Sequence, residues 1–312
     1  LFQLSDKNTD RQSFSMIGTV KNINHPPKFL LTSSEMYVTI CVCVCVCVCV
    51  CVYTYTYLGG KIMKTIAVIN QKGGVGKSTT AENLASGLAL RGYHTLAVDL
   101  DAQANLTYTM GVSTDGATIL GVLTGEVKIH DAIRHSQTCD VIPASKALAG
   151  ADAFITDTGK EYRLREALDE IRDDYDFTVI DTPPALGILT VNALTACDSV
   201  VIPAQADIYS LHGIEQLTKT IAPVRKYCNR SLRIEGILLT RYSSRSVLSR
   251  EIADLSNQLA DKLGTKLFNA RIREAIAVKE AQLNQKSLFE YSPKAGVTED
   301  YSACIDELLE DK

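Results

Sequence analysis

The chain has 312 residues and 46% hydrophobic content, so it is long enough to bury a full core. Its formal net charge of -4 excludes a globally basic nucleic-acid-binding protein, and any DNA contact has to come from a local basic patch. Six of its ten cysteines lie in one Cys-Val repeat, and the other four are scattered singly without CxxC spacing. That spacing argues against a zinc site, an iron-sulfur site and a disulfide framework.

A two-letter repeat dominates the first part of the chain. Cys and Val alternate from Cys41 to Val52, and a Tyr-Thr alternation follows to Tyr57. A translated dinucleotide repeat gives this pattern, so we expect residues 1–62 to be a non-native or disordered leader and Met63 to be the native start. The repeat can also be interpreted as a β-strand, since its period of two fits a pleat, or as a membrane span. The apolar run is shorter than the roughly 20 residues that a spanning helix needs.

From Met63 onward, short Val- and Ile-rich runs alternate with longer amphipathic stretches. The alternation predicts one α/β domain over residues 63–312, with a doubly wound, mostly parallel sheet and helices on both faces. The expected strands are Thr65–Asn70, Thr95–Asp99, Asp140–Pro143, Phe177–Asp181, Ser199–Pro203, Arg233–Thr240 and Lys266–Phe268. The expected helices are Lys77–Arg91, Lys160–Asp173, Ile188–Ala196, Leu211–Tyr227, Val247–Leu263 and Asp300–Leu309.

A glycine-rich loop joins the first of these strands to the first helix. It reads Lys72-Gly73-Gly74-Val75-Gly76-Lys77-Ser78-Thr79. In this strand-loop-helix context the glycines let backbone N–H groups surround phosphate oxygens, and the helix adds the positive end of its dipole. We expect Lys77 to contact the β- and γ-phosphates, Ser78 to ligate Mg²⁺ and Thr79 to hold the α-phosphate. The predicted cofactors are therefore ATP and Mg²⁺.

Acidic residues follow two further strands. Asp99 and Asp101 come at the end of the second strand, and side-chain alternation predicts that both point toward the loop. We expect Asp101 to position the attacking water, although Asp is also a favoured helix N-cap. Asp181 ends an apolar strand and is expected to hold Mg²⁺ through a bound water. Thr182 and the two prolines after it should form a stiff loop that senses the γ-phosphate.

The loop departs from the general phosphate-loop pattern at its start. Gln71 replaces a glycine there, and Lys72 is an additional lysine. The sequence K-G-G-V-G-K-S-T resembles the deviant Walker ATPases, the ParA, Soj and MinD group. The resemblance continues through D-L-D-A-Q-A-N at residues 99–105, where Ala102 replaces the usual proline, and covers essentially Met63 to the C-terminus. It is closer to ParA and Soj than to MinD, and it implies that Lys72 acts on the nucleotide of a partner copy. A solvated surface charge is the other interpretation of Lys72.

The resemblance also implies a cellular task. In ParA-type partition, ATP drives a sandwich homodimer that binds DNA without sequence preference. A ParB-like centromere-binding partner then stimulates slow hydrolysis, so that plasmid, mobile-element or chromosomal DNA is segregated. Such a protein is expected in the cytoplasm, associated with the nucleoid.

A basic segment gives independent support for DNA binding. Between Lys219 and Glu280 the chain has thirteen Lys and Arg residues but six Asp and Glu residues, a surplus that can bind phosphates non-specifically. A solvated helix face is the simpler interpretation of any one of them. The candidate DNA contacts are Arg241, Arg245, Arg271 and Arg273.

Two other tasks are considered for the same scaffold. A MinD-like positioning factor would need a basic amphipathic tail, but the segment from Tyr301 to Lys312 is acidic, so no membrane partner is expected. A metabolic ligase or synthetase remains an alternative, because a phosphate loop does not determine the second substrate.

Overall fold

The computed structural model describes residues 14–16, 37–45, 48–56 and 63–310, and the chain divides into two compact units, Leu1–Ile62 and Met63–Lys312. In the first unit, β1 (Phe14–Met16), β2 (Tyr37–Cys45) and β3 (Val48–Thr56) form an antiparallel sheet in the order β1-β3-β2. These strands match the strand interpretation of the repeat. The start at Met63 and the non-native origin of the leader stay predictions.

The second unit is built on one eight-stranded sheet. Its strands are β4 (Lys64–Val68), β5 (Thr95–Asp99), β6 (Arg134–His135), β7 (Asp140–Ile142), β8 (Phe177–Asp181), β9 (Ser199–Gln205), β10 (Arg233–Tyr242) and β11 (Leu267–Arg273). The order is β11-β10-β9-β4-β8-β5-β7-β6, and every neighbouring pair is parallel except β6 with β7. The predicted doubly wound α/β fold is confirmed, and β6 is an addition to it.

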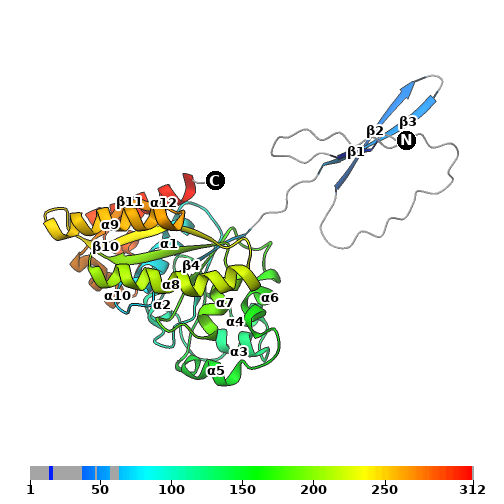
Figure 1. Ribbon diagram of the computed structural model, residues 1–312. Helices are drawn as coiled ribbons and strands as arrows, with labels where there is room; N and C mark the ends of the chain where they lie inside the picture. Colours follow the sequence, from blue (N-terminus) through cyan, green and yellow to red (C-terminus); the bar gives the residue numbers. More distant parts are fainter. Residues whose placement is uncertain (1–13, 17–36, 46–47, 57–62, 311–312) are drawn as a thin grey trace. The chain divides into compact units, whose positions relative to one another are not determined.

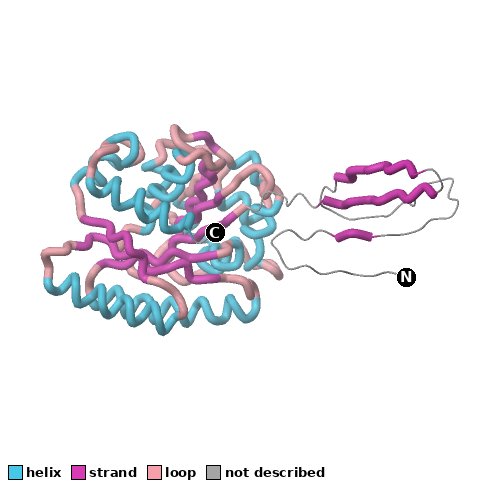
Figure 2. The backbone as a smooth tube through the Cα atoms, turned by 90° about the horizontal axis from the view of Figure 1, so that it is seen from above, coloured by secondary structure: helices cyan, strands magenta, loops and turns pink. Residues whose placement is uncertain are grey.

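Helices cover both faces of this sheet (Figures 1 and 2). The clusters of buried side chains place α1, α10, α11 and α12 on one face and α6, α7, α8 and α9 on the other. The helices are α1 (Lys77–Leu90), α2 (Asn105–Thr109), α3 (Ile119–Thr124), α4 (Ile129–Ala132), α5 (Ala151–Phe154), α6 (Arg163–Asp169), α7 (Ile188–Ala196), α8 (Ile208–Tyr227), α9 (Val247–Leu263), α10 (Ile276–Leu283), α11 (Leu288–Tyr291) and α12 (Gly296–Glu310). Within the described part of the chain, no helix has both the length and the hydrophobicity needed to cross a membrane.

The central strands are apolar on both sides because both sides are covered. In β4, Ile66 and Val68 pack against the layer that contains α1, and Ala67 packs into the opposite layer. All three are fully buried. The run of apolar residues that predicted a central strand is therefore explained by its two packed faces, and the end of this strand becomes a rigid base for the loop that follows.

Close packing also fixes helix α1 behind that loop. A side chain at Gly87 would bring its Cβ within 2.2 Å of Ile305 Cδ1 and 2.9 Å of Phe289 Cζ. Only glycine lets α1 approach α11 and α12 this closely. The C-terminal helices therefore buttress the helix that begins at the phosphate loop.

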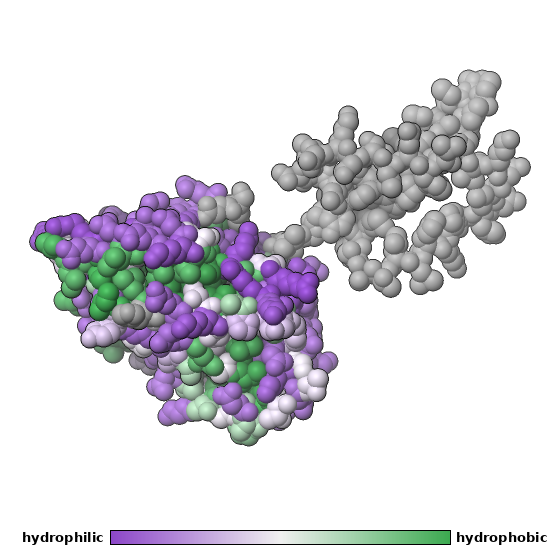
Figure 3. Space-filling view, viewed as in Figure 1, coloured by the Kyte–Doolittle hydropathy of each residue, from purple (hydrophilic) through white to green (hydrophobic). Residues whose placement is uncertain are grey.

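The helix layer that contains α8 and α9 has a hollow on its surface. On the face in Figure 3, a strip of hydrophobic side chains lies between hydrophilic side chains that cover α8 and α9. A hollow there is lined by Ile221 and Ala222 of α8, Leu263 of α9, and the basic residues Arg225 and Lys226. This region lies outside the residues that the motifs single out.

Candidate nucleotide-binding site

The phosphate loop occupies residues 69–76, at the carboxyl end of β4. Gly74 and Gly76 adopt left-handed backbone angles, with φ of 75° and 89°, which glycine tolerates without strain. Helix α1 then begins at Lys77, and its N-cap residue is Gly76, which has no side chain to cap the first N–H groups. The first N–H groups of α1 are thus left for an anion, as the phosphate-loop prediction requires.

Residues far away in the sequence hold the loop in shape. The side-chain amide of Gln205 donates a hydrogen bond to the Gly74 carbonyl at 2.9 Å. The Thr240 hydroxyl donates to the Val75 carbonyl, also at 2.9 Å. These partners lie 131 and 165 residues from the loop, near the ends of β9 and β10, and no local motif predicts their contact with it. The loop is therefore preorganised by the neighbouring strands.

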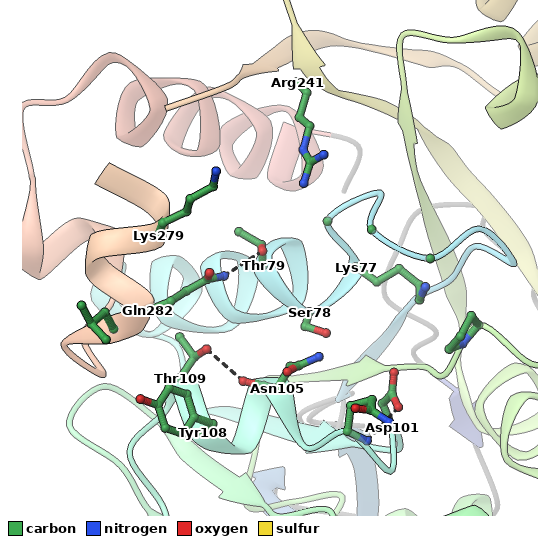
Figure 4. Close-up of a pocket in the computed structure, with 16 residues that line it drawn as sticks. Lys77, Ser78, Thr79, Asp101, Asn105, Tyr108, Thr109, Arg241, Lys279 and Gln282 are labelled. Carbon is green, nitrogen blue, oxygen red and sulfur yellow. Dashed lines mark hydrogen bonds between the residues drawn. The ribbon is translucent and has the colours of Figure 1, made fainter. Parts of the chain in front are cut away.

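A cavity of about 650 Å³ lies over the loop (Figure 4). Its lining includes most of the residues predicted from the motifs, namely Gly73, Gly74, Gly76, Lys77, Ser78, Thr79 and Asp101. Val75 is buried and belongs to the base of the loop. Helix α10 closes one side, where Gln282 donates from its amide to the Thr79 hydroxyl at 3.0 Å. No motif in the sequence indicates Gln282 as a site residue.

Lys77 lies among carboxylates under the loop. Its side chain is largely buried, and its ammonium group donates to the Lys72 carbonyl at 3.2 Å. Burial lowers the pKa of Lys77, while the negative charges of Asp181 and Asp101 act in the opposite direction. A triphosphate would supply further negative charge to this buried ammonium group.

Asp181 has the features of an incomplete metal ligand. It is fully buried, and within residues 63–310 both of its carboxylate oxygens lack a hydrogen-bond partner. Burial and the neighbouring Asp99 raise the pKa of Asp181 well above its usual range. A buried carboxylate without partners is costly, and a hard cation with oxygen ligands would relieve that cost. Ser78 lines the cavity, and its hydroxyl is near enough to Asp181 to lower the pKa of that carboxyl, so these oxygen donors fit Mg²⁺.

Asp99 and Asp101 have different environments: Asp101 lines the cavity, whereas Asp99 does not line it and lies buried near Asp181. One oxygen of Asp99 accepts from the Asp101 N–H at 3.0 Å, and the other accepts from the N–H and hydroxyl of Thr107 at 2.9 and 2.7 Å. Burial raises the pKa of Asp99 to about 6. Strand β5 ends at Asp99, so the alternation does not extend to Asp101. Asp99 organises the turn from which Asp101 reaches the cavity.

Asp101 does not act as a helix N-cap, which was the other interpretation of this residue. Its carboxylate accepts from the Gln103 N–H at 3.0 Å, whereas the N-cap of α2 is Ala104, which has no side-chain capping bond. Asp101 therefore stabilises a local turn and lines the cavity without capping a helix.

The loop after β8 was predicted to sense the γ-phosphate. The buried hydroxyl of Thr182 donates to the Val68 carbonyl at 2.8 Å, so it is not free to donate to a phosphate. Pro184 lines the cavity, and γ-phosphate sensing by this loop stays a prediction.

Lys72 turns away from the cavity. Its ammonium group forms an ion pair with Asp207 at 2.5 Å and lies 3.4 Å from both Gln205 Oε1 and the Ser210 hydroxyl. The side chain is 30% exposed, so Lys72 is paired and not simply a solvated surface charge. Its action on a partner's nucleotide stays a prediction.

Comparison with known proteins places this site in a family. The AAA domain family profile matches residues 63–234. The chain is 38% identical over 243 residues to the sporulation initiation inhibitor protein Soj of Bacillus subtilis, covering 76% of this chain and 95% of that protein. It is 37% identical over 254 residues to the chromosome partitioning protein ParA of Caulobacter vibrioides, covering 79% of this chain and 94% of that protein. The chain belongs to the ParA/Soj family of ATPases. Family membership confirms the resemblance found in the motifs and the ATPase activity predicted from them.

A solved structure shares the fold of this ParA/Soj-type ATPase. It is described as cobyrinic acid a,c-diamide synthase from Mycobacterium smegmatis with bound ADP and magnesium. The match has a TM-score of 0.70 and 32% identity, and it covers 80% of this chain and 95% of that chain. The name of this structure corresponds to the metabolic alternative considered from the sequence.

The four candidate DNA contacts of this ParA/Soj-type ATPase lie together. Arg241, Arg245, Arg271 and Arg273 all line a hollow of about 1040 Å³ near the carboxyl ends of β10 and β11. Arg273 is engaged by Asp300 through two hydrogen bonds of 2.7 Å, and burial lowers the pKa of Arg271. Arg241 and Arg245 are exposed and form no ion pair with any residue that the structure describes. The hollow thus contains two available arginines and two that are already partly engaged.

Proposed function

We propose that this chain is an ATP-dependent partition protein of the ParA type. It binds and slowly hydrolyses Mg-ATP, forms an ATP sandwich dimer that binds DNA non-specifically, and is stimulated by a ParB-like centromere-binding partner to segregate DNA at the nucleoid. The observation that supports this most is a preorganised glycine loop above the buried Lys77 and above Asp181, which has no hydrogen-bond partner among residues 63–310. Similarity to Soj and ParA over nearly the whole length of those proteins supports the partition task.

The polar groups predicted from the motifs each have a role in this proposal. Backbone N–H groups of the loop and the Lys77 ammonium group bind the β- and γ-phosphates, and Thr79, oriented by Gln282, holds the α-phosphate. Mg²⁺ held by Ser78, and by Asp181 through a water, would neutralise phosphate charge. Asp101, held by its own turn at the cavity wall, orients the attacking water.

The arginine hollow is the DNA-binding surface in this proposal. Arg241, near the end of β10, and Arg245, in the loop after β10, provide two exposed positive charges. Such contacts to phosphates are independent of base sequence and weaken as salt increases. A dimer doubles the number of contacts, which explains why DNA affinity would depend on the nucleotide.

The decisive experiment compares DNA binding in the two nucleotide states. DNA co-sedimentation of the full chain is measured with ATP, with a non-hydrolysable ATP analogue and with ADP, at several salt concentrations. The proposal expects strong retention with ATP and the analogue, weak retention with ADP, and a steep loss as salt rises. Equal binding in all three states would count against a nucleotide-controlled DNA switch.

A metabolic synthetase is the second candidate, because of the name of the similar mycobacterial structure. An enzyme that obtains ammonia from glutamine through a cysteine nucleophile needs a reactive thiolate. Cys139, Cys197 and Cys304 are buried, and burial raises the pKa of each thiol. These three thiols are thus unsuited to that chemistry. ATP-dependent amide formation without any nucleotide-dependent DNA binding would favour the synthetase.

A further inference from the structure

Lys72, at the start of the phosphate loop, is held by residues of its own chain. Strand β9 ends at Gln205 and α8 begins at Ile208, so Asp207 is the N-cap residue of α8. The Lys72 ammonium group lies 2.5 Å from Asp207 Oδ2 and 3.4 Å from the Gln205 and Ser210 side-chain oxygens. The lysine that distinguishes this loop is therefore surrounded by oxygen acceptors of the same chain.

Asp207 serves two partners with its two carboxylate oxygens. Oδ1 accepts from the Ser210 N–H at 2.9 Å and caps α8, while Oδ2 faces Lys72. Burial would raise the pKa of Asp207, but the hydrogen bonds from Lys72 and from the Ser210 N–H outweigh it and hold the pKa below the ordinary value. Because the cap uses a different oxygen, Lys72 can leave Asp207 without breaking the start of α8.

This inference rests on the proposed function, in which Lys72 reaches the nucleotide of a second copy. We propose that the Lys72–Asp207 pair is a latch that holds Lys72 in cis, and that an ATP-loaded second copy must open it when the dimer forms. Asp207 is thus a positioning residue, which acts through Lys72 and does not touch the nucleotide. The phosphates of the second copy compete with one carboxylate oxygen for the same ammonium group.

Two features around the latch favour a second copy as the competitor. Leu186, Ile208 and Tyr209 are large hydrophobic residues left exposed, Tyr209 by 74%, and they follow β8 and β9, the two strands that flank β4. Gln205 offers its carbonyl oxygen to Lys72 while its amide holds the Gly74 carbonyl of the loop. The latch is therefore connected to the part of the loop that would bind phosphate and is flanked by apolar surface that a dimer would cover.

The first test measures dimerisation of the Asp207→Asn variant. Asparagine keeps the cap of α8 but removes the charge that holds Lys72. Sedimentation velocity with a saturating non-hydrolysable ATP analogue gives the dimer dissociation constant. We expect a decrease of roughly 2- to 30-fold, because each of the two copies no longer has to break a partly exposed ion pair. Asp207→Glu keeps the negative charge, so its dimer dissociation constant should stay closer to that of the unmodified protein.

A matched control tests whether any lost ion pair has this effect. Asp306 pairs with Arg91 at 2.6 Å, at the end of α1 far from the loop, and Asp306→Asn should leave the dissociation constant unchanged. An unchanged or increased dissociation constant for Asp207→Asn overturns the latch, even when the unmodified protein dimerises with ATP as proposed.

A second measurement tests the Lys72–Asp207 pair in the nucleotide-free protein, so it does not depend on dimer formation. Amine-reactive labelling of the nucleotide-free protein, followed by mass spectrometry, gives the reactivity of Lys72 relative to the exposed Lys146. The latch predicts that Lys72 is protected and that Asp207→Asn raises its relative labelling rate severalfold. Equal rates in both proteins overturn the latch. Failure of the unmodified protein to dimerise would instead overturn the proposed function, and the labelling result would still decide whether Asp207 holds Lys72.

Discussion

Charged side chains at the centre of the sheet are buried, whereas those at its outer edge are more exposed. At the carboxyl ends of β4, β5 and β8, Lys77, Asp99 and Asp181 are buried, and Asp181 has no hydrogen-bond partner among the residues that the structure describes. Beside β10 and β11 the arginines are more exposed, and Arg273 is already paired with Asp300. Buried groups without partners are tolerated where a ligand completes them, whereas exposed charges act additively and weakly. Single substitutions should therefore have large effects at the centre and small ones at the edge.

The largest effect is expected for Lys77→Ala. Removing the buried ammonium group leaves the triphosphate without its main charge-assisted hydrogen bonds, and we expect Mg-ATP affinity to fall by roughly 1,000-fold or more. Isothermal titration calorimetry measures the change. Lys279→Ala is the matched control, because Lys279 is an exposed lysine on the rim of the same cavity. A comparable loss in both variants would show that burial does not distinguish the two lysines.

Asp101→Ala should separate binding from hydrolysis. Asp101 lines the cavity wall and interacts with its own turn, so its removal should change ATP affinity by less than about 3-fold. The hydrolysis rate should fall by about 100-fold or more, since the attacking water loses its general base. Phosphate release and nucleotide binding are measured on the same preparation. Loss of ATP binding would overturn the assigned role of Asp101.

A buried carboxyl on α1 gives a prediction about pH. Burial raises the pKa of Glu82 to about 8, against the lowering effect of the Ser86 hydroxyl, which donates to it at 3.0 Å. Because the folded-state pKa exceeds the unfolded value of 4.5, this group's contribution to stability is fully present below about pH 4.5 and is lost as pH rises through about 8.

Glu82→Gln should remove this dependence, because the amide is neutral at every pH and its oxygen can still accept from Ser86. We expect the variant to exceed the unmodified protein in free energy of unfolding by on the order of 4 kcal/mol at pH 8, and by little at pH 4.5. Urea unfolding at a series of pH values measures the difference. A difference that does not vary with pH would contradict the buried-charge explanation.

The smallest effects are expected at the arginines. Arg245→Ala should reduce DNA affinity severalfold and lower the salt slope by about one, because one phosphate contact is lost. Arg273→Ala should change DNA affinity less, since Asp300 already neutralises its guanidinium group. Fluorescence anisotropy at several salt concentrations gives both quantities. Equal losses in the two variants would show that Asp300 releases Arg273 when DNA binds.

Local sequence patterns predicted the parts of the fold and site that depend on near neighbours. In the eight-stranded sheet, every strand except β6 was predicted from a run of apolar residues, and the phosphate loop was predicted from glycine spacing. Both are short-range signals. The short helices α2 to α5 and the two-residue strand β6 have too few residues to show a period. Strand β11 extends to Arg273, beyond the expected end at Phe268, because pairing with β10 stabilises it.

The partners of the loop were not predictable for a different reason. Gln205, Thr240 and Gln282 reach it from 131 to 203 residues away, so only the folded sheet brings them together. The Asp207 partner of Lys72 was missed for the same reason, at a separation of 135 residues. The hydrogen bonds of Asp99 to Thr107 were not predicted either, because they depend on how the chain turns after β5 ends at Asp99.

One of these distant bonds gives the molecule a physical connection between its two charged regions. The Thr240 hydroxyl holds the Val75 carbonyl, and the next residue along β10 is Arg241, whose backbone has the left-handed φ of 49°. Any displacement of the loop that moves this carbonyl must either pull the end of β10 with it or break the bond. A single threonine thus couples the position of the phosphate-binding backbone to the first arginine of the outer hollow, without any intervening domain.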